Sequence, residues 1–194
     1  MKRISIAIAL SALVSSCSAP DSALDKEILA KVTTYHSAIK TLGGSLKSEL
    51  KTAMKAGGPL NALDVCHTKA DPISNKVSEQ VGFSLKRTSL KPRNSNNAPD
   101  DWERAVLEKF EQRKAQGENP KTLEFVEVVE NNGQRQVRYM KAISTGGACL
   151  KCHGSKVDPQ VLSKIKELYP DDKAIGFQSG DLRGAFSITE TLPK

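Results

Sequence analysis

Two cysteines and a histidine near residue 150 form the pattern in this sequence with the most definite chemistry. Cys149 and Cys152 are separated by two residues, and His153 follows directly. This C-x-x-C-H spacing is that of covalent haem attachment, because two thiols one helical turn apart can reach the two vinyl groups at one edge of a porphyrin. The imidazole of the next residue then lies near the iron. The spacing predicts a single haem c, bound through Cys149 and Cys152, with His153 as an axial iron ligand.

A disulfide, a redox-active C-x-x-C pair and half of a zinc site are the alternative uses of this cysteine pair. Zinc sites normally have four ligands at regular spacing, and the sequence has no second C-x-x-C. A thioredoxin-like pair would follow a strand at the start of a helix in a βαβ unit, and the surrounding pattern lacks this arrangement. The spacing therefore favours haem c.

The iron of such a haem would take a second axial ligand, and spacing alone does not select it. Cys66 lies on the same predicted helix face as Leu63, whereas His67 is rotated from Cys66 by roughly 100°. Both side chains cannot reach one iron without distortion, so they are alternatives. A cysteine on an apolar helix face is most often a packing residue, which leaves the choice open. The residues that could serve are Cys66, His67, His36, Met54, Met140 and Tyr35.

The N-terminus has the pattern of an export signal that ends at a cysteine. The basic segment Met1–Arg3 precedes an apolar stretch, Ile4–Val14, that is shorter than the roughly 20 residues of a membrane-spanning helix. Small residues then lead to Cys17, as in the lipobox of bacterial lipoproteins. We expect residues 1–16 to be a lipoprotein signal peptide, Cys17 to carry lipid and residues 17–22 to form a tether. The alternative is an ordinary signal peptide cleaved nearby, with Cys17 unmodified.

Export and haem attachment are independent features that agree. Haem c is attached outside the cytoplasm, where the N-terminal signal would send the chain. We therefore expect the protein on the periplasmic side of the cell envelope, held at the membrane by its lipid anchor.

Composition excludes some classes of function. The chain has 194 residues and a net charge of +7; without Lys2 and Arg3, 27 basic and 22 acidic residues leave +5. This charge is spread along the chain without a long basic run, so nucleic acid is not an expected partner. No Ser-His-Asp or paired-carboxylate arrangement is evident, so we do not expect an enzyme. Aromatic residues are only 5% of the chain, and a large apolar cofactor would compensate for the small supply of rings.

Hydrophobic periodicity predicts helices first and strands later. Apolar residues recur at steps of three and four from Leu24 to Met54, which predicts a long amphipathic helix that ends at the glycine–proline segment 56–59. A second helix is expected over 60–69, and a third begins with Asp71 as N-cap and Pro72 at its first position. This order predicts one α+β domain over residues 23–194. Further expected elements are strands near 83–90, 123–130, 136–143 and 184–191, a helix over 102–114 and a helix capped by Asp158.

Three stretches of the sequence resemble a known family. They are Val65–Cys66 with Ala70–Pro72, Arg87–Asn94 with Asn97–Glu103, and Cys149–Gly154 with Gly184–Ile188. Over roughly residues 25–191, the chain is similar to bacterial single-haem c proteins with a PAS-like fold, first recognised as a domain of unknown function. The resemblance implies a PAS-like antiparallel sheet with a long N-terminal helix and flanking helices.

The resemblance also implies a second iron ligand. In a characterised type of that family, a cysteine of the early helical region lies opposite the motif histidine, and Cys66 occupies the matching position here. His67 beside it keeps a bis-histidine site as the alternative. The chain departs from many relatives after Asn94, where Ser95 stands in place of a proline.

The loop that follows the first expected strand supplies candidate cofactor contacts. Arg87, Lys91 and Arg93 are candidates to bind the haem propionates, because guanidinium groups bind carboxylates in a two-pronged manner. The alternative is a solvated surface loop.

Two functions are compatible with these features. A cysteine thiolate ligand would lower the potential of the iron and favour a redox or gas sensor that acts on a separate redox or signalling protein. The alternative is a small periplasmic electron-transfer cytochrome c.

Overall fold

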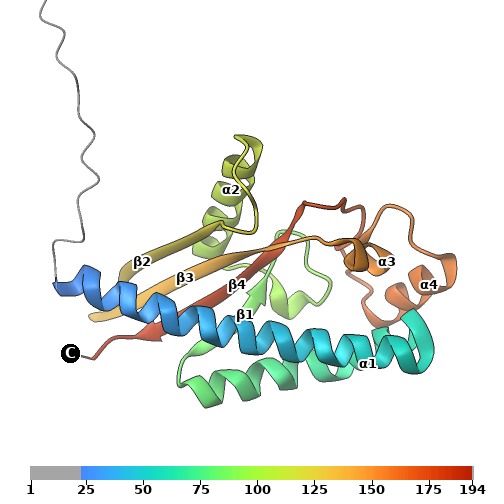
Figure 1. Ribbon diagram of the computed structural model, residues 1–194, viewed down its shortest axis with the longest axis horizontal. Coiled ribbons are helices and arrows are strands. Elements are labelled where there is room, and N and C mark those ends of the chain that lie inside the picture. The colour runs from blue at the N-terminus through green and yellow to red at the C-terminus, as the bar shows by residue number, and fades with distance from the viewer. Residues whose placement is uncertain (1–22, 194) are drawn as a thin grey trace, which may run out of the picture.

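Helices cover both faces of a four-stranded antiparallel sheet in the computed structural model, which describes residues 23–193 (Figure 1). The predicted fold class is confirmed: an α+β, PAS-like arrangement with a long N-terminal helix and flanking helices. The predicted signal peptide (residues 1–16), the tether (17–22) and Cys17 lie outside the described residues. The elements are α1 (Ala23–Val81), β1 (Ser84–Thr88), η1 (Ser95–Asn97), α2 (Asp101–Ala115), β2 (Glu124–Asn131), β3 (Gln134–Ser144), η2 (Gly147–Cys149), α3 (Leu150–His153), α4 (Pro159–Leu168) and β4 (Leu182–Thr191).

Helix α1 doubles back on itself, as the glycine–proline segment predicted. Gly57 and Gly58 have non-helical backbone angles, and the second half of α1 returns alongside the first (Figure 1). An ion pair between Lys69 and Glu49, 3.0 Å apart, joins the two halves across the turn.

The predicted start of a separate helix at Asp71 and Pro72 is wrong. The helix runs through both residues, and the carboxylate of Asp71 accepts hydrogen bonds from Asn94 and Asn96 instead of capping. Proline inside a helix removes one backbone hydrogen bond and costs about 3 kcal/mol. Packing on both sides of the proline outweighs this cost, because Leu63 before it packs on α4 and Val77 after it belongs to the core between α1 and the sheet.

The sheet has the order β1-β4-β3-β2 with every neighbouring pair antiparallel. Strands β2 and β3 form the predicted hairpin, which turns at Asn132 and Gly133. Strand β4, last in the chain, pairs with both β1 and β3 and so joins the first strand to the hairpin.

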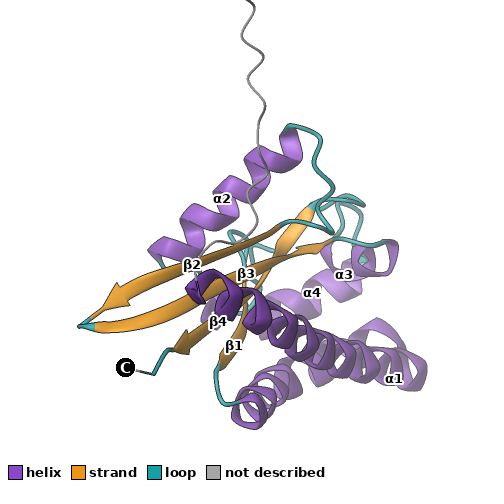
Figure 2. Ribbon diagram, turned by 60° about the vertical axis from the view of Figure 1, so that its left-hand side comes forward, coloured by secondary structure: helices purple, strands orange, loops and turns teal. Residues whose placement is uncertain are grey.

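Alternation along the strands divides the core between the two faces of the sheet. Tyr139 and Ile188 pack against α1, whereas Met140 and Ala185 pack against α2 around Phe110. Figure 2 shows α1 and α2 on opposite sides of the sheet. Within residues 23–193, none of the helices is both long and apolar enough to span a bilayer.

Polar contacts also hold the first half of α1 to the sheet. Tyr35 and Lys31 both donate to the carboxylate of Glu190 on β4, at 2.5 and 2.7 Å. On β2, Glu124 accepts from Tyr139 at 2.6 Å and contacts His36 at 2.8 Å. The position of α1 is therefore set by ion pairs and hydrogen bonds as well as by apolar packing.

Gly184 provides a test of how tightly β1 and β4 meet. Its φ is +152°, and an added Cβ would overlap the carbonyl oxygen of Thr88. We predict that Gly184→Ala lowers the free energy of unfolding by about 2 kcal/mol or more, measured by chemical denaturation.

Gly44 is the matched control, because it lies inside α1 and a methyl group added there would have no atom within 4 Å. Gly44→Ala should raise stability by about 0.5–1 kcal/mol. Equal effects of the two substitutions would contradict the close approach at Gly184.

Candidate functional site

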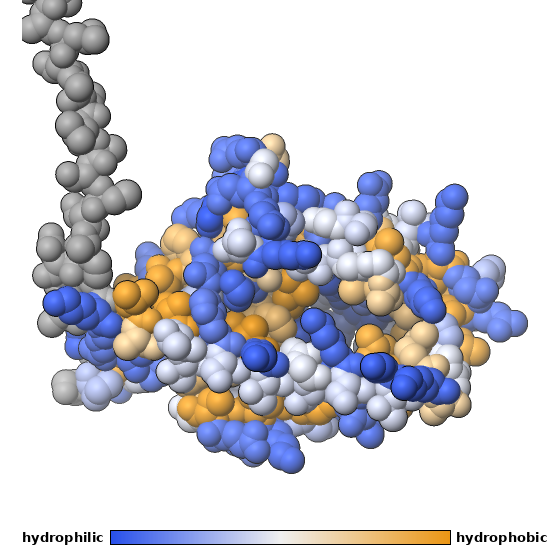
Figure 3. Space-filling model, in the orientation of Figure 1, coloured by the Kyte–Doolittle hydropathy of each residue, from blue (hydrophilic) through white to orange (hydrophobic). Residues whose placement is uncertain are grey.

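The C-x-x-C-H motif lies on the long segment that connects β3 to β4, residues 145–181, which we call the excursion. The excursion is closed at its base by two backbone hydrogen bonds, from Thr145 to Asp181 at 2.7 Å and from Gly180 to Thr145 at 2.9 Å. Cys149 ends η2, while Cys152 and His153 lie on α3, so the motif forms the predicted helical turn. The surface is hollowed between α1 and this excursion (Figure 3).

Gly154 allows the motif to fold against its own first turn. Its N–H donates to the carbonyl oxygen of Leu150, and an added Cβ would lie only 2.6 Å from that oxygen. The backbone then pairs with the last part of the excursion, where Phe177 donates to His153 at 2.9 Å. The ring of Phe177 also meets the imidazole edge to face, with centroids 6.3 Å apart.

The imidazole of His153 is fixed in one tautomer. Its Nδ1 lies 2.7 Å from the carbonyl oxygen of Ala174. A carbonyl only accepts, so Nδ1 carries the proton and Nε2 keeps its lone pair. Burial, with the charges of Arg183 and Arg93, lowers the pKa of His153 to about 3 against the opposing effect of that hydrogen bond. The ring is therefore neutral at pH 7, which is the form that binds metals.

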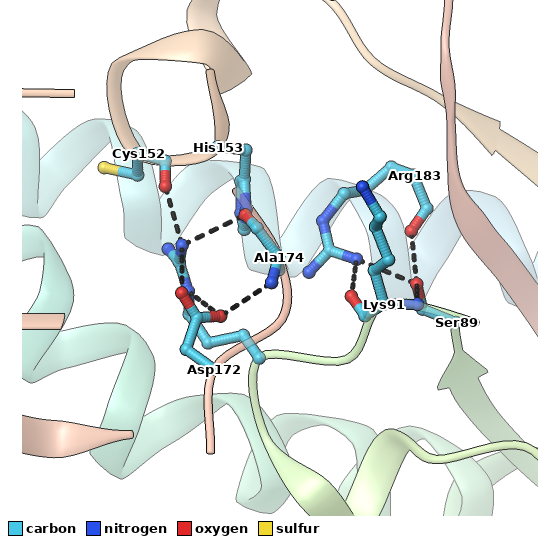
Figure 4. Close-up of polar contacts among 8 residues, drawn as sticks. Ser89, Lys91, Cys152, His153, Asp172, Ala174 and Arg183 are labelled. Carbon is cyan, nitrogen blue, oxygen red and sulfur yellow. Dashed lines mark hydrogen bonds and ion pairs between the residues drawn. The ribbon is translucent and has the colours of Figure 1, made fainter. Parts of the chain in front are cut away.

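Arg93 holds together the two segments that fix the histidine. Its guanidinium pairs with Asp172 and also donates to the carbonyl oxygens of Cys152 and Ala174, at 2.6 and 3.2 Å (Figure 4). Asp172 in turn accepts from the backbone N–H of Ala174 at 2.9 Å. The contacts of Arg93 and Asp172 with Ala174 therefore set the position of the carbonyl oxygen that accepts from Nδ1 of His153.

Three half-buried arginines, Arg87, Arg93 and Arg183, surround the site with little opposing charge. Burial lowers the pKa of Arg183 to about 10, and the neighbouring charges of Arg93 and Arg87 contribute to that shift. Burial likewise lowers the pKa of Arg87. Within residues 23–193, only Arg93 among these three forms an ion pair, and the Nε atoms of Arg87 and Arg183 have no hydrogen-bond partner. Buried cationic donors without partners indicate a site for an anion.

Arg183 is a site residue that the sequence did not point out. Its Nη1 donates to Ser89 Oγ and to the carbonyl oxygen of Lys91, both at 3.1 Å (Figure 4). The predicted site residue Lys91 has its ammonium 5.3 Å from the ring centroid of Phe177. Asp172 and Ala174 were also missed. The only sequence signal for Arg183 is that it precedes Gly184 in a stretch that resembles the family.

Cys66 and His67 have different surroundings on the returning half of α1. Burial raises the pKa of the Cys66 thiol, with Arg87 opposing and Cys152 reinforcing that shift, so Cys66 lies near both the arginines and the motif. The ring of His67 packs edge to face on Tyr169, 5.0 Å between centroids. Leu63, one turn from Cys66, packs in the same cluster as Cys152.

Three other candidate axial ligands have different roles. Tyr35 and Met140 are fully buried in the cores on the two faces of the sheet. His36 contacts Glu124 and Tyr139 on the sheet. These contacts leave Cys66, His67 and the half-buried Met54, and of these Cys66 has Cys152 of the motif among its neighbours.

The residues at this site fit a haem. Cys149 and Cys152 are free thiols rather than a disulfide. His153 offers an unprotonated Nε2, and the unpartnered Nε atoms of Arg87 and Arg183 match the acceptors that two propionates would bring. Zinc has less support, since no cluster of three or more His, Cys, Asp or Glu residues that could hold a metal occurs in the described part of the chain.

The Arg93–Asp172 pair can be tested without any cofactor. The two side chains are only 10% and 7% exposed. We predict that Asp172→Ala lowers the free energy of unfolding by about 3 kcal/mol, because it leaves a buried guanidinium unpaired. Glu49→Ala, which breaks an exposed ion pair with Lys69, is the control and should cost less than about 1 kcal/mol. Similar losses in urea denaturation of the two variants would contradict a supporting role for Arg93.

Comparisons with other proteins agree with this site. A family model described as Tll0287-like matches residues 21–190. The crystal structure of the cyanobacterial heme-protein Tll0287 is similar, with 25% sequence identity and a TM-score of 0.60 over 87% of this chain and 97% of that chain. No curated protein sequence matches significantly. The match over most of the chain confirms the resemblance seen in the sequence: the protein belongs to the Tll0287-like family.

Proposed function

We propose that this chain is an exported, lipid-anchored c-type cytochrome that holds one covalent haem and acts as a redox or gas sensor. The observation that carries the proposal is the neutral His153, whose Nδ1 is tied to Ala174 and whose Nε2 is free beside two reduced cysteines. The haem bound by the related cyanobacterial protein supports the same cofactor here. The N-terminal pattern supports a position on the periplasmic side of the envelope.

Attachment needs only the thiols of Cys149 and Cys152 and the two vinyl groups. Each sulfur bonds to one vinyl carbon and its hydrogen goes to the other, so no external oxidant or reductant is consumed. Cys149 at the N-cap of α3 and Cys152 within it would hold one edge of the porphyrin, and His153 on the same turn would supply the nitrogen ligand to its iron.

The half-buried Arg87 and Arg183 would bind the haem propionates. Arg87 and Arg183 each have an Nε in need of an acceptor, whereas Arg93 is already committed to Asp172 and two carbonyls. In this proposal, Arg87 and Arg183 are the main propionate contacts. Arg93 does not bind the haem and instead positions Cys152 and Ala174 through their carbonyl oxygens. Lys91 contributes charge near Phe177.

Cys66 is the proposed second axial ligand, with His67 as the alternative. Its support is the shared electrostatic environment of Cys66, Arg87 and Cys152. When bound, the haem supplies an iron that exchanges one electron and binds diatomic gases at an open position. A thiolate from Cys66 would favour the oxidised state of the iron, whereas Cys66 as a neutral thiol would bind the iron weakly and leave that position available to a gas. The chain would transmit this change to a separate signalling or redox protein.

Covalent attachment is the first test of the proposal. We predict that protein exported from cells with a c-type maturation system keeps haem after denaturation, with a haem c pyridine haemochrome spectrum and the mass of one haem. The double variant Cys149→Ala/Cys152→Ala should lose both signals. A wild-type protein with two free thiols, or a disulfide, and no added mass would refute the proposal.

Substitution of Cys66 separates the sensor from the carrier. We predict that Cys66→Ala changes the absorption spectrum of the oxidised protein and raises the midpoint potential by on the order of 0.1 V or more, within the roughly 0.8 V that axial ligands span. His67→Ala, the neighbouring control, should leave both unchanged. A change in His67→Ala alone would identify bis-histidine ligation, and a high potential that neither variant alters would favour the electron carrier.

A further inference from the structure

The first half of α1 carries a row of unpaired lysines on one side. This basic stripe consists of Lys26, Lys40, Lys47, Lys51 and Lys55. All five are exposed, and none forms an ion pair with another residue in the range 23–193. By contrast, Lys31 on the same helix and Lys69 on its returning half are both paired with glutamates.

Helical geometry places the stripe on a single face. Lys40, Lys47, Lys51 and Lys55 are separated by seven, four and four residues, which keeps them in line along a helix. Glu27 and Glu49 project roughly 120° and 160° from the centre of the stripe. From Lys26 to Lys55 the stripe extends about 43 Å at 1.5 Å per residue.

Small residues separate the lysines of the stripe. Exposed Thr33, Ser37, Gly44 and Ser48 separate them, and Figure 3 shows strongly hydrophilic residues along α1 with residues of neutral hydropathy between them. Leu29, 61% exposed, lies on the same side near the start of the helix. A long row of one charge with an apolar residue near one end suits a planar anionic surface better than a shaped protein partner.

We propose that the basic stripe is a docking surface for anionic phospholipid headgroups. This inference rests on the proposed lipid at Cys17, from which α1 is separated only by residues 18–22. Those residues can span at most about 20 Å, so the anchor keeps the start of α1 near the membrane. With α1 lying along the bilayer, its opposite side still holds the sheet through Tyr35 and Lys31.

Lysine acetylation of the native, haem-loaded lipoprotein tests the proposal. The protein is reconstituted into neutral phosphatidylcholine vesicles or into vesicles that also contain anionic phosphatidylglycerol, and site-specific rates are read by mass spectrometry. We expect anionic vesicles to slow acetylation of the stripe by about five-fold, the factor that corresponds to one lysine at an anionic surface. About 1 M salt, with a Debye length of about 3 Å, should remove the protection.

Lys109 and Lys121 are internal controls, because both are exposed and neither is on α1: Lys109 lies on α2, across the sheet from α1, and Lys121 lies in the connection from α2 to β2. Their rates should be equal in both kinds of vesicle. Equal stripe rates in the two vesicles, or equal protection of the controls, would overturn the proposal. Lys47→Glu/Lys51→Glu should abolish the difference at the remaining stripe lysines, whereas Lys109→Glu/Lys121→Glu should preserve it.

Failure of the proposed anchor is recognised separately by intact mass. If the exported chain carries no lipid, it is added to the same vesicles and sedimented. Binding to anionic but not neutral vesicles, weakened about 25-fold or more in Lys47→Glu/Lys51→Glu, would support the stripe alone. No difference between the two vesicles would refute the stripe as well.

Discussion

The hydrogen bond from His153 Nδ1 to the carbonyl oxygen of Ala174 is the constraint on which the site depends. It decides which ring nitrogen keeps a lone pair and where that nitrogen lies relative to the two cysteines. Arg93 and Asp172 hold Ala174 from the other side and so fix the oxygen that accepts this bond. The same guanidinium reaches Cys152, so one buried cation positions both the attachment turn and the histidine. A network of this kind orients a ligand before any metal arrives.

Electrostatics give the site its preference for an anionic cofactor. Arg87, Arg93 and Arg183 crowd together at the cost of lowered pKa values for Arg87 and Arg183. Asp172 forms an ion pair with only one of them. The same positive charges contribute to the lowered pKa of His153 and keep it neutral. Two carboxylates at the edge of a porphyrin would supply the missing acceptors. The same arginine charges would therefore attract the propionates and keep the imidazole of His153 neutral.

Features that depend on neighbouring residues could be predicted from the sequence, whereas contacts between residues far apart in the chain could not. The spacing of Cys149, Cys152 and His153 and the turns of single elements depend on neighbouring residues, and the structure contains them. Arg183 and Asp172 acquire their roles only when β4 and the end of the excursion meet Ser89 and Arg93. The prediction that a new helix begins at Pro72 was wrong, because packing of the returning half of α1 outweighs the preference of proline for the first turn of a helix. The anion preference of Arg87 becomes visible only with its burial.

The position of the iron tests the central claim most directly. A crystal structure of the natively exported protein, with anomalous data collected at the iron edge, locates the metal independently of how the porphyrin ring is placed. The account predicts one iron peak within bonding distance of His153 Nε2, with Nδ1 still hydrogen-bonded to Ala174. An iron peak bonded to other residues with His153 turned away, or no iron in fully folded protein, would contradict it.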